Sequence, residues 1–259
     1  MTLPSLFSLQ DKVAVITGSS RGIGKSIAEQ MALAGAKVVI SSRKAEPCNQ
    51  VVAEITARGG QARACPANIS DKAQLQHLVD DTLAAWGRID VLVCNAAVNP
   101  YFGPSAGISD EQFDKIMHAN IKANHWLCNM VLPQMAGRKD GVILIVSSVS
   151  GLTGSTLLAA YGISKAADMQ LCRNLAAEWG HANIRINCLA PGLIQTDFAR
   201  ALWENPPLLE RITARSSLRR IGQPEEVAGA AVFLAADAGR FITGQTIVID
   251  GGGNLGDVF

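Results

Sequence analysis

The feature that most constrains the fold of this chain is an alternation of short, uniformly apolar runs with longer amphipathic segments. Lys12–Thr17 and Val142–Ser147 are two of the apolar runs, and each is a candidate for a buried strand. Apolar strands that are separated by helical segments are typical of a parallel sheet covered by helices on both sides. Because crossovers between parallel strands are right-handed, the sequence predicts a doubly wound α/β sheet.

The same alternation predicts where the elements begin and end. Strands are expected at residues 12–17, 37–42, 61–66, 90–94, 142–147, 184–190 and 246–250. Helices are expected from a glycine-rich turn to residue 34, over 46–58, 71–86 (capped by Ser70), 110–135 and 159–180, and from residue 224. One irregular insertion, residues 193–223, interrupts the alternation. We expect it to be a substrate lid, because a segment of that length outside regular structure is usually functional.

Composition excludes several classes of protein. Because 48% of the 259 residues are hydrophobic, the chain can bury a large core, which argues against global disorder. The 23 Lys and Arg residues balance 22 Asp and Glu residues, so no general attraction to nucleic acid or to an anionic membrane is expected. The longest charge-free stretch, residues 141–164, is interrupted by Gly, Ser and Thr, and Met1–Leu9 lacks the basic flank of a signal peptide. Neither segment predicts a membrane span or export.

Cysteine and histidine usage favours a reducing compartment and gives no support for a metal site. The six cysteines contain no C-x-x-C pair, and the four histidines contain no H-x-x-x-H pair. The thiols are therefore expected to be free and buried, and the protein to be cytoplasmic. The cysteines are Cys48, Cys65, Cys94, Cys128, Cys172 and Cys188.

A glycine-rich turn follows the first expected strand. Its sequence is Gly18-Ser19-Ser20-Arg21-Gly22-Ile23-Gly24, at a strand-to-helix junction. Glycines there permit a tight turn and let the backbone approach a pyrophosphate, whose charge is favoured by the free N–H groups and dipole of the helix N-terminus. On the first strand of a long α/β alternation, this pattern predicts a dinucleotide-binding site.

The end of the second expected strand indicates which dinucleotide is bound. NAD-binding folds of this kind carry an acidic residue about 20 residues after the turn. This strand instead ends in Ser41-Ser42-Arg43-Lys44, with no acid. A cation there can pair with a 2′-phosphate, and Ser42 can donate a hydrogen bond to it. We therefore expect NADP(H) to be preferred, with NAD(H) possible, and Arg21 to form the second wall of the phosphate site.

Three residues in and beside the charge-free stretch predict general acid–base chemistry. Tyr161 lies thirteen residues after Ser148, and Lys165 lies four residues after Tyr161, on the same face of the expected helix. The free pKa of tyrosine is about 10, and a nearby ammonium lowers it by favouring the phenolate. Tyr161 and Lys165 are therefore a candidate general acid/base pair. Ser148, at the carboxyl end of a strand, could donate to a substrate carbonyl.

Together these motifs resemble the short-chain dehydrogenase/reductase family over nearly the whole chain, residues 12–253. The resemblance implies a single-domain Rossmann fold over residues 1–259, with seven parallel strands in the order 3-2-1-4-5-6-7. It adds Asn120, whose family counterpart holds a water in the proton relay, to Ser148, Tyr161 and Lys165 as a catalytic tetrad. Asn95-Ala96-Ala97 matches the family's N-N-A-G motif, although Cys94 replaces its first Asn and Ala97 its Gly.

The resemblance also implies the remaining cofactor contacts. In the family, the segment after the sixth strand contacts the nicotinamide carboxamide, and an Asp, here Asn68, bonds the adenine. The expected cofactor-binding residues are Gly18, Ser20, Arg21, Gly22, Ile23, Gly24, Ser42, Arg43, Asn68, Ile69, Asn95, Ala96, Ala97, Tyr161, Lys165, Pro191, Gly192, Ile194 and Thr196.

The mechanism that the resemblance implies is hydride transfer from NADPH to a ketone or aldehyde, with alcohol oxidation as the reverse. Tyr161 protonates the oxygen and Ser148 orients the carbonyl. Lys165 binds the nicotinamide ribose and lowers the pKa of the tyrosine, and Asn120 connects that lysine to solvent. The family further implies a homodimer or homotetramer, with helices 110–135 and 159–180 at the main interface.

Four hypotheses for the function stay open. The leading one is an NADPH-dependent reductase of small ketones or aldehydes, and the second is a reductase of 3-oxoacyl thioesters on a carrier protein or coenzyme A, which Arg215, Arg219 and Arg220 in the lid could attract. The third, a sugar or polyol dehydrogenase, is suggested by Leu6-Phe7-Ser8-Leu9, which resembles gluconate dehydrogenases of this family. The fourth is a cofactor-sensing protein without turnover, against which the complete catalytic set argues.

The residues expected near the substrate suggest a moderately apolar carbonyl compound. They come from the segments after the fourth and fifth strands and from the lid. They are Asn99, Pro100, Tyr101, Phe102, Val149, Ser150, Leu152, Leu193, Phe198 and Trp203.

Overall fold

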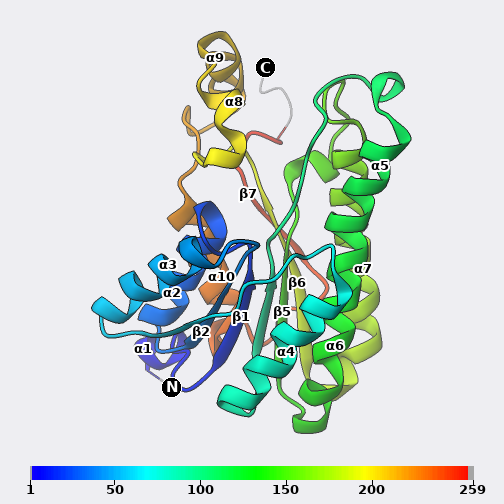
Figure 1. Ribbon diagram of the computed structural model, residues 1–259. Helices are drawn as coiled ribbons and strands as arrows, with labels where there is room; N and C mark the ends of the chain where they lie inside the picture. Colours follow the sequence, from blue (N-terminus) through cyan, green and yellow to red (C-terminus); the bar gives the residue numbers. More distant parts are fainter. Residues whose placement is uncertain (1, 256–259) are drawn as a thin grey trace.

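The computed structural model describes residues 2–255, and its centre is one parallel sheet (Figure 1). The strand order is β3-β2-β1-β4-β5-β6-β7, which confirms the expected doubly wound Rossmann arrangement. The strands are β1 (Val13–Thr17), β2 (Lys37–Ser41), β3 (Gln61–Ala64), β4 (Val91–Cys94), β5 (Gly141–Val146), β6 (Ile184–Pro191) and β7 (Thr246–Ile249).

Helices cover both faces of the sheet (Figure 1). One face carries α2 (Gly22–Leu33), α3 (Ala45–Ala57) and α10 (Pro224–Ala235). The other carries α4 (Lys72–Trp86), α6 (Ala123–Arg138) and α7 (Ala159–Trp179), with α5 (Asp110–Met117) leading into α6. The short helices are α1 (Leu3–Leu6), α8 (Arg200–Trp203) and α9 (Pro206–Arg215).

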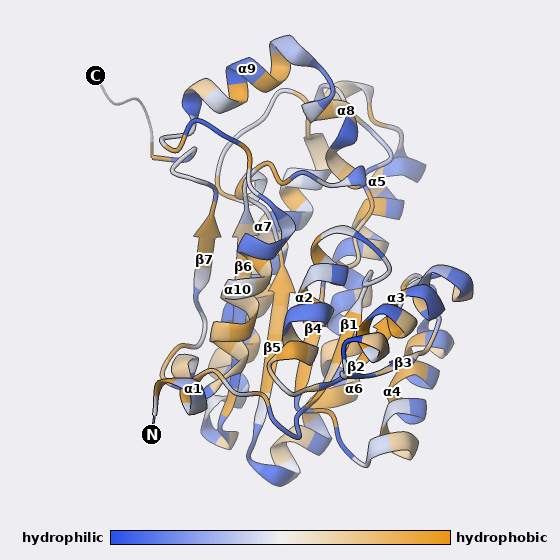
Figure 2. Ribbon diagram, turned by 90° about the vertical axis from the view of Figure 1, so that its left-hand side faces the viewer, coloured by the Kyte–Doolittle hydropathy of each residue, from blue (hydrophilic) through white to orange (hydrophobic). Residues whose placement is uncertain are grey.

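The uniformly apolar strands contribute side chains to two hydrophobic cores, one on each face of the sheet. In β5, Ile143 and Ile145 face α4, α6 and α7, whereas Val142, Leu144 and Val146 face α2 and α10. Successive side chains of a strand point to opposite faces, so a strand covered on both sides must be apolar at every position. Figure 2 shows the result as hydrophobic strands between helices that carry their polar residues outward.

The helix expected over residues 110–135 is wrong as one continuous element. His118–Lys122 form a π-helical turn between α5 and α6. The extra residue of this turn points the Asn120 side chain at the backbone of Val98, where Asn120 Oδ1 accepts from the Val98 N–H at 2.9 Å and Nδ2 donates to the Val98 carbonyl at 3.1 Å. A π-turn inside an α-helix is frequent at functional sites, and periodicity alone does not reveal it.

The expected cap of α4 is also corrected. Asp71, not Ser70, is the N-cap, and its carboxylate accepts hydrogen bonds from the N–H groups of Ala73 and Gln74. The Gln74 side chain donates to the second carboxylate oxygen at 2.9 Å. Ser70 instead belongs to the preceding turn, where its N–H donates to Asn68 Oδ1.

The parallel register brings the carboxyl ends of the strands to one edge of the sheet. Thr17 pairs with Ser41, Val93 with Leu144, and Pro191 with Ile249. In Figure 1, α8 and α9, which belong to the connection after β6, stand above this edge of the sheet. Doubly wound sheets bind ligands at this edge. Within residues 2–255, no helix has both the length and the apolarity needed to cross a membrane.

Candidate active site

The glycine-rich turn between β1 and α2 has the backbone that its sequence predicts. Gly18 and Gly22 have φ values of +65° and +55°, a region that favours glycine. Gly24 is required for a different reason: a Cβ there would collide with the Asn95 side chain and with the Gly18 carbonyl. The first turn of α2 is therefore held close to the end of β1.

Asn95 fixes this turn to the sheet. Its Nδ2 donates to the carbonyls of Thr17 at 2.9 Å and Gly18 at 3.2 Å. Thr17 Oγ1 accepts from the N–H groups of Asn95 and Ala96, both at 3.1 Å. Thr17 was not among the expected site residues, although its position as the last residue of β1 was a usable signal.

The start of α2 offers donors to an anion. Arg21 is the N-cap of α2. Its backbone is extended, and its side chain forms no capping hydrogen bond with the first turn. The leading N–H groups of a helix lack intrahelical partners, and the helix dipole favours negative charge there. Together with the glycine turn, this end of α2 fits a pyrophosphate. Thr196 lies beside it, since its Cγ2 would be 3.2 Å from a Cβ placed on Gly22.

The residues expected around the adenosine lie at the ends of β2 and β3. Arg43 is exposed and Ser42 half-buried, and Arg43 forms no ion pair with any residue in the 2–255 range. Arg21 lies 4.0 Å from the Asp197 carboxylate in the lid. Asn68 uses Oδ1 to accept from Ser70, which leaves its Nδ2 group available. Ile69 packs against the core.

Three of the four expected catalytic side chains lie just after β5 or in α7. Ser148 follows β5, and its Oγ accepts from the Ser150 N–H at 3.1 Å. Tyr161 and Lys165 lie one turn apart in α7, with Lys165 Nζ 5.7 Å from the centre of the Tyr161 ring. Lys165 Nζ donates to the carbonyl of Val146 at 2.8 Å, which ties the ammonium to the carboxyl end of β5.

Lys165 has a partner that the sequence analysis missed. The Asp168 carboxylate lies 3.1 Å from Nζ, and both side chains are buried, with 0% and 2% of their surface exposed. Burial lowers the pKa of the lysine, but the charges of Asp168 and Tyr161 more than offset it, so the pKa of Lys165 is raised above its usual value. Burial raises the pKa of the Asp168 carboxyl, and Lys165 counters only part of that effect.

A signal for this partner was present in the sequence. Tyr161, Lys165, Asp168 and Cys172 follow the i, i+4, i+7, i+11 spacing of one helical face. Lys165, Asp168 and Cys172 are all buried. A carboxylate in that row is costly to bury alone, so it indicates an ion pair with the lysine.

Asn120 lies in the π-turn, and both polar atoms of its side chain form hydrogen bonds with neighbouring residues. Nδ2 also donates to Ser164 Oγ at 3.0 Å. Its main-chain carbonyl accepts from Asn124 Nδ2 at 2.6 Å, and the same Nδ2 lies 2.9 Å from Asp168 Oδ1. A continuous row of polar groups therefore runs from the Asn120 carbonyl to the Lys165 ammonium.

The segment expected to contact the nicotinamide leads from β6 into the lid. Pro191 ends β6, and Gly192 packs so closely on Asp250 that a Cβ there would lie 2.8 Å from the Asp250 Cβ. Ile194 is buried and pairs with Gly222 in an isolated bridge. That bridge joins the two ends of the expected lid, residues 193–223.

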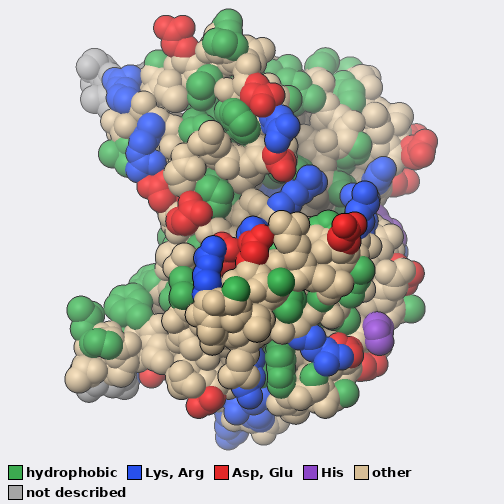
Figure 3. All heavy atoms as spheres, turned by 60° about the vertical axis from the view of Figure 1, so that its left-hand side comes forward, with side chains coloured by type: hydrophobic (Ala, Val, Ile, Leu, Met, Phe, Trp, Pro, Cys, Tyr) green, Lys and Arg blue, Asp and Glu red, His purple; other side chains and the backbone are tan. Residues whose placement is uncertain are grey.

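Residues 193–223, the expected lid, lie over the carboxyl edge of the sheet, and the surface is hollowed below them (Figure 3). It contains α8 and α9, which the sequence analysis expected only as irregular chain. Trp203 Nε1 donates to the Thr196 carbonyl at 2.8 Å. Among the lid arginines, Arg220 pairs with Glu226 at 2.6 Å and Arg219 donates to the Ala214 carbonyl.

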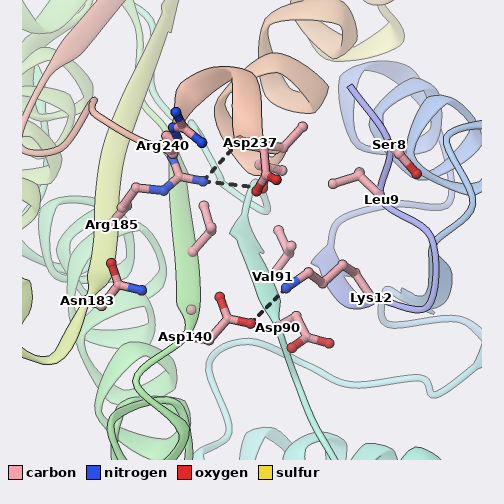
Figure 4. Close-up of a pocket in the computed structure, with 14 residues that line it drawn as sticks. Ser8, Leu9, Lys12, Asp90, Val91, Asp140, Asn183, Arg185, Asp237 and Arg240 are labelled. Atoms are coloured by element: carbon pink, nitrogen blue, oxygen red, sulfur yellow. Dashed lines mark hydrogen bonds and ion pairs between the residues drawn. The ribbon is translucent and has the colours of Figure 1, made fainter. Parts of the chain in front are cut away.

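A second hollow lies at the opposite edge of the sheet, before β1, β4, β5 and β6 (Figure 4). Its volume is about 100 Å³, and its charged groups hold the fold together. Lys12 pairs with Asp140 at 2.7 Å, and Arg185 donates to the carbonyls of Leu234 and Gly239 at 2.6 and 2.8 Å, near the end of α10. This hollow is not the expected active site.

Known proteins resemble this chain over most of its length. The family described as enoyl-(acyl carrier protein) reductase matches residues 18–254. Dehydrogenase/reductase SDR family member 4 of Bos taurus is 41% identical over 244 residues, which cover 94% of this chain and 88% of the bovine protein. The chain belongs to the short-chain dehydrogenase/reductase family. The protein is therefore an oxidoreductase by family, and the resemblance inferred from the motifs is confirmed.

Two solved dehydrogenase structures share the whole fold. Gluconate 5-dehydrogenase from Burkholderia cenocepacia, in complex with NADP and tartrate, has a TM-score of 0.95 and 31% identity, covering 99% of this chain and 100% of that one. A 7α-hydroxysteroid dehydrogenase, complexed with NADH and 7-oxo glycochenodeoxycholic acid, has a TM-score of 0.94 and 36% identity, covering 97% and 98%.

Proposed function

We propose that this protein interconverts a ketone or aldehyde and the corresponding alcohol, with NADP(H) as the preferred cofactor. The observation that carries the proposal is the placement of Tyr161 and Lys165 one turn apart in α7, with Lys165 tied to the end of β5 beside Ser148. This group lies at the same sheet edge as the glycine turn, which fits a dinucleotide.

The chain's own residues supply the acid–base chemistry. When bound, the nicotinamide cofactor donates or accepts the hydride. Tyr161 gives its phenolic proton to the substrate oxygen during reduction and takes it back during oxidation. Lys165, held as an ammonium, favours the phenolate and makes this exchange easier near neutral pH. Ser148 donates a hydrogen bond to the carbonyl and stabilises negative charge on the oxygen.

The preference for NADP(H) is supported by the charges after β2. Arg43 is exposed and forms no ion pair with a residue in the 2–255 range, so its guanidinium is available to a 2′-phosphate. No acidic residue stands at Ser41-Ser42-Arg43-Lys44 to bind the ribose hydroxyls of NAD. The two structural neighbours hold NADP in one case and NADH in the other, so NAD(H) is kept as the alternative cofactor.

Two other substrates remain as alternatives. Reduction of a 3-oxoacyl thioester is compatible with the family description, but Arg219 and Arg220 are already engaged within the chain, which weakens their role in binding a carrier. Oxidation of a sugar acid or polyol is favoured by the gluconate 5-dehydrogenase neighbour. The exposed apolar side chains of Phe198 and Phe102 favour a less polar substrate. A non-catalytic sensor is the least favoured, because the acid–base group is complete.

The assembly and compartment follow as part of the same proposal. We infer a homodimer or homotetramer, with the helices α5, α6 and α7 at the main interface, and a cytoplasmic location. All six cysteines are buried free thiols, as expected from their spacing, and this suits a reducing compartment.

The experiment that tests the proposal is a screen of simple diketones, aldehydes, acetoacetyl thioesters, steroids and polyols with NADPH and with NADH. Turnover is followed by the absorbance of the reduced nicotinamide. Tyr161→Phe is the matched control, because it removes only the phenolic hydroxyl. We expect reduction of carbonyl compounds by the wild-type protein, and loss of turnover in the variant with NADPH binding retained. Equal turnover by the two proteins would refute the assigned chemistry.

A further inference from the structure

The connection between β4 and α5, which rises opposite α8 and α9 at the top of Figure 1, contains a tyrosine that is held in its own turn. Tyr101 Oη donates to the Pro104 carbonyl at 2.8 Å. A Cβ added at Gly103 would lie 2.6 Å from that oxygen, and a Cβ added at Gly107 would lie closer still. We propose that Tyr101 is a positioning residue, which fixes this connection and thereby the part of α7 that carries Tyr161. The proposal rests on the acid–base role of Tyr161 under the proposed function.

Residues 98–103, here called the strap, are tied to α7 at one end through Asn120. Both main-chain polar groups of Val98 bond to the Asn120 side chain, at 2.9 and 3.1 Å. Asn120 Nδ2 also donates to Ser164 Oγ at 3.0 Å, and Ser164 Oγ donates to the Tyr161 carbonyl at 2.8 Å. The first end of the strap is therefore linked to the main chain of Tyr161 through two polar side chains.

The other end of the strap is tied to the residues that lead into α7. The Gly103 N–H donates to the Leu157 carbonyl at 2.8 Å, and Gly103 pairs with Leu158 in an isolated parallel bridge. Leu158 is the N-cap of α7, and Tyr161 follows three residues later. Both ends of the strap are thus bonded to the start of α7, and Tyr101 lies between them.

The start of α7 needs such a support, because its own residues fix it poorly. The N-cap Leu158 forms no side-chain capping hydrogen bond. Ala159 has a φ of +26°, which is unfavourable for a residue with a Cβ. A strained backbone conformation persists only where the surrounding structure enforces it. The strap supplies that support, since Gly103 bonds to the two residues directly before Ala159.

Tyr101 holds the strap in shape at Gly103. The Pro104 carbonyl accepts from Tyr101 Oη at 2.8 Å and from the Gly107 N–H at 3.0 Å, so the hydroxyl is bonded to the turn that it fills. The tyrosine ring also lies against Gly103, where an added Cβ would be 2.9 Å from Cζ. A displacement of the ring therefore moves Gly103 and the bonds that it makes with the start of α7.

The test adds one methyl group and then removes the atom that it meets. Gly107→Ala places a Cβ against Tyr101 Oη and should displace the ring. In Tyr101→Phe/Gly107→Ala that oxygen is absent, and the next ring atom, Cζ, lies 3.5 Å from the added Cβ, which is an ordinary contact. We expect kcat for carbonyl reduction to fall about tenfold in Gly107→Ala, because the acid/base is misplaced. The double variant should recover the kcat of Tyr101→Phe, which should lose less than Gly107→Ala.

Tyr101→Phe/Gly103→Ala is the matched control. The Cβ at residue 103 also meets Cζ, an atom that phenylalanine keeps, so kcat should stay as low as in Gly103→Ala. The Kd of NADPH should be the same in every variant, because residues 95–97, which are held by Thr17, precede the strap. If circular dichroism shows that Gly107→Ala does not fold, Tyr101→Ala, which removes the ring and adds no group, is measured instead, with the same expected fall in kcat.

Hydrogen exchange of the ligand-free protein, followed by mass spectrometry, tests the same link without a substrate. The Gly162 N–H donates to the Leu158 carbonyl at 3.1 Å and reports on the first turn of α7. In Gly107→Ala we expect faster exchange at residue 103 and at residues 162–165, and wild-type rates at residues 162–165 in Tyr101→Phe/Gly107→Ala.

Three results overturn the proposal: a wild-type kcat in folded Gly107→Ala, failure of Tyr101→Phe to restore it, or faster exchange confined to residues 99–107. The exchange measurement separates this proposal from the proposed function. Absence of turnover on every substrate would count against the function, while faster exchange at residues 162–165 in the same samples would still assign the support of α7 to Tyr101.

Discussion

The ring of Phe198 lies 6.2 Å from the ring of Tyr161, centroid to centroid, although the two residues belong to the lid and to α7. Phe198 is 55% exposed, so this contact leaves much of its apolar surface uncovered. An apolar side chain held beside the candidate acid/base is placed to contact the substrate rather than to stabilise the core.

The first prediction concerns this aromatic side chain. Phe198→Ala should lower kcat/KM for apolar carbonyl substrates by about tenfold, equivalent to about 1.4 kcal/mol of lost transition-state binding. The thermal midpoint should hardly change, because the side chain is half exposed. Steady-state kinetics with a matched series of small and bulky ketones checks this. Phe241→Ala, which alters an exposed phenylalanine outside the lid, is the control, and an equal loss in both variants would contradict the assignment.

The second prediction concerns the cofactor. Arg43→Asp should raise the KM for NADPH and lower that for NADH, because a carboxylate repels a 2′-phosphate and can accept hydrogen bonds from ribose hydroxyls. A tenfold or larger change in the ratio of kcat/KM values is expected, since a charge-assisted pair is lost, which costs about 1.5–3 kcal/mol. Arg58→Asp, at the end of α3, makes the same change in net charge away from this site. An unaltered ratio in Arg43→Asp would refute the phosphate site.

The third prediction concerns the start of α2. Gly24→Ala should weaken binding of both NADPH and NADH, because the new Cβ collides with Asn95 and the Gly18 carbonyl and displaces the turn. Calorimetric titration of each cofactor measures the loss. Gly137→Ala in α6, where no atom lies within 4 Å of an added Cβ, should leave binding intact and add up to about 1 kcal/mol of stability. Tight cofactor binding by the Gly24 variant would exclude a close fit at this turn.

The fourth prediction concerns the attachment of the lid in acid. Hydrogen bonds from Arg220 and from the Gln223 backbone lower the pKa of Glu226 to about 2. A carboxyl whose pKa is lower in the folded than in the unfolded protein adds stability above its unfolded pKa, and that stability is lost as the pH falls toward 2. The thermal midpoint of wild type should therefore exceed that of Glu226→Gln at pH 6. The two should converge as the pH falls toward 2, and a constant difference would show that the charge is not involved.

Much of the fold was predictable because the local pattern of apolar and polar residues indicates which segments are buried. The apolar runs at β1 and β5 and the Gly18–Gly24 turn each carry their signal within a few residues. The π-turn at Asn120 was not predictable from periodicity, because the hydrogen bonds of its side chain go to Val98, a residue 22 positions away in the sequence. The N-cap of α4 was placed one residue too early, because Ser70 and Asp71 are both good capping residues.

The sequence by itself determined the kinds of groups at the site and their order along the chain: the glycine turn, the cation at Arg43, and Ser148 with Tyr161 and Lys165. Such assignments depend on residue type and short spacing, which the chain carries locally. Only the tertiary structure decided that Phe198 faces Tyr161, and that Asp168 and Asn124 join Lys165 to Asn120. Those relations depend on how α6, α7, β5 and the lid pack against one another. Distances between residues on different elements are fixed only when the whole core is packed.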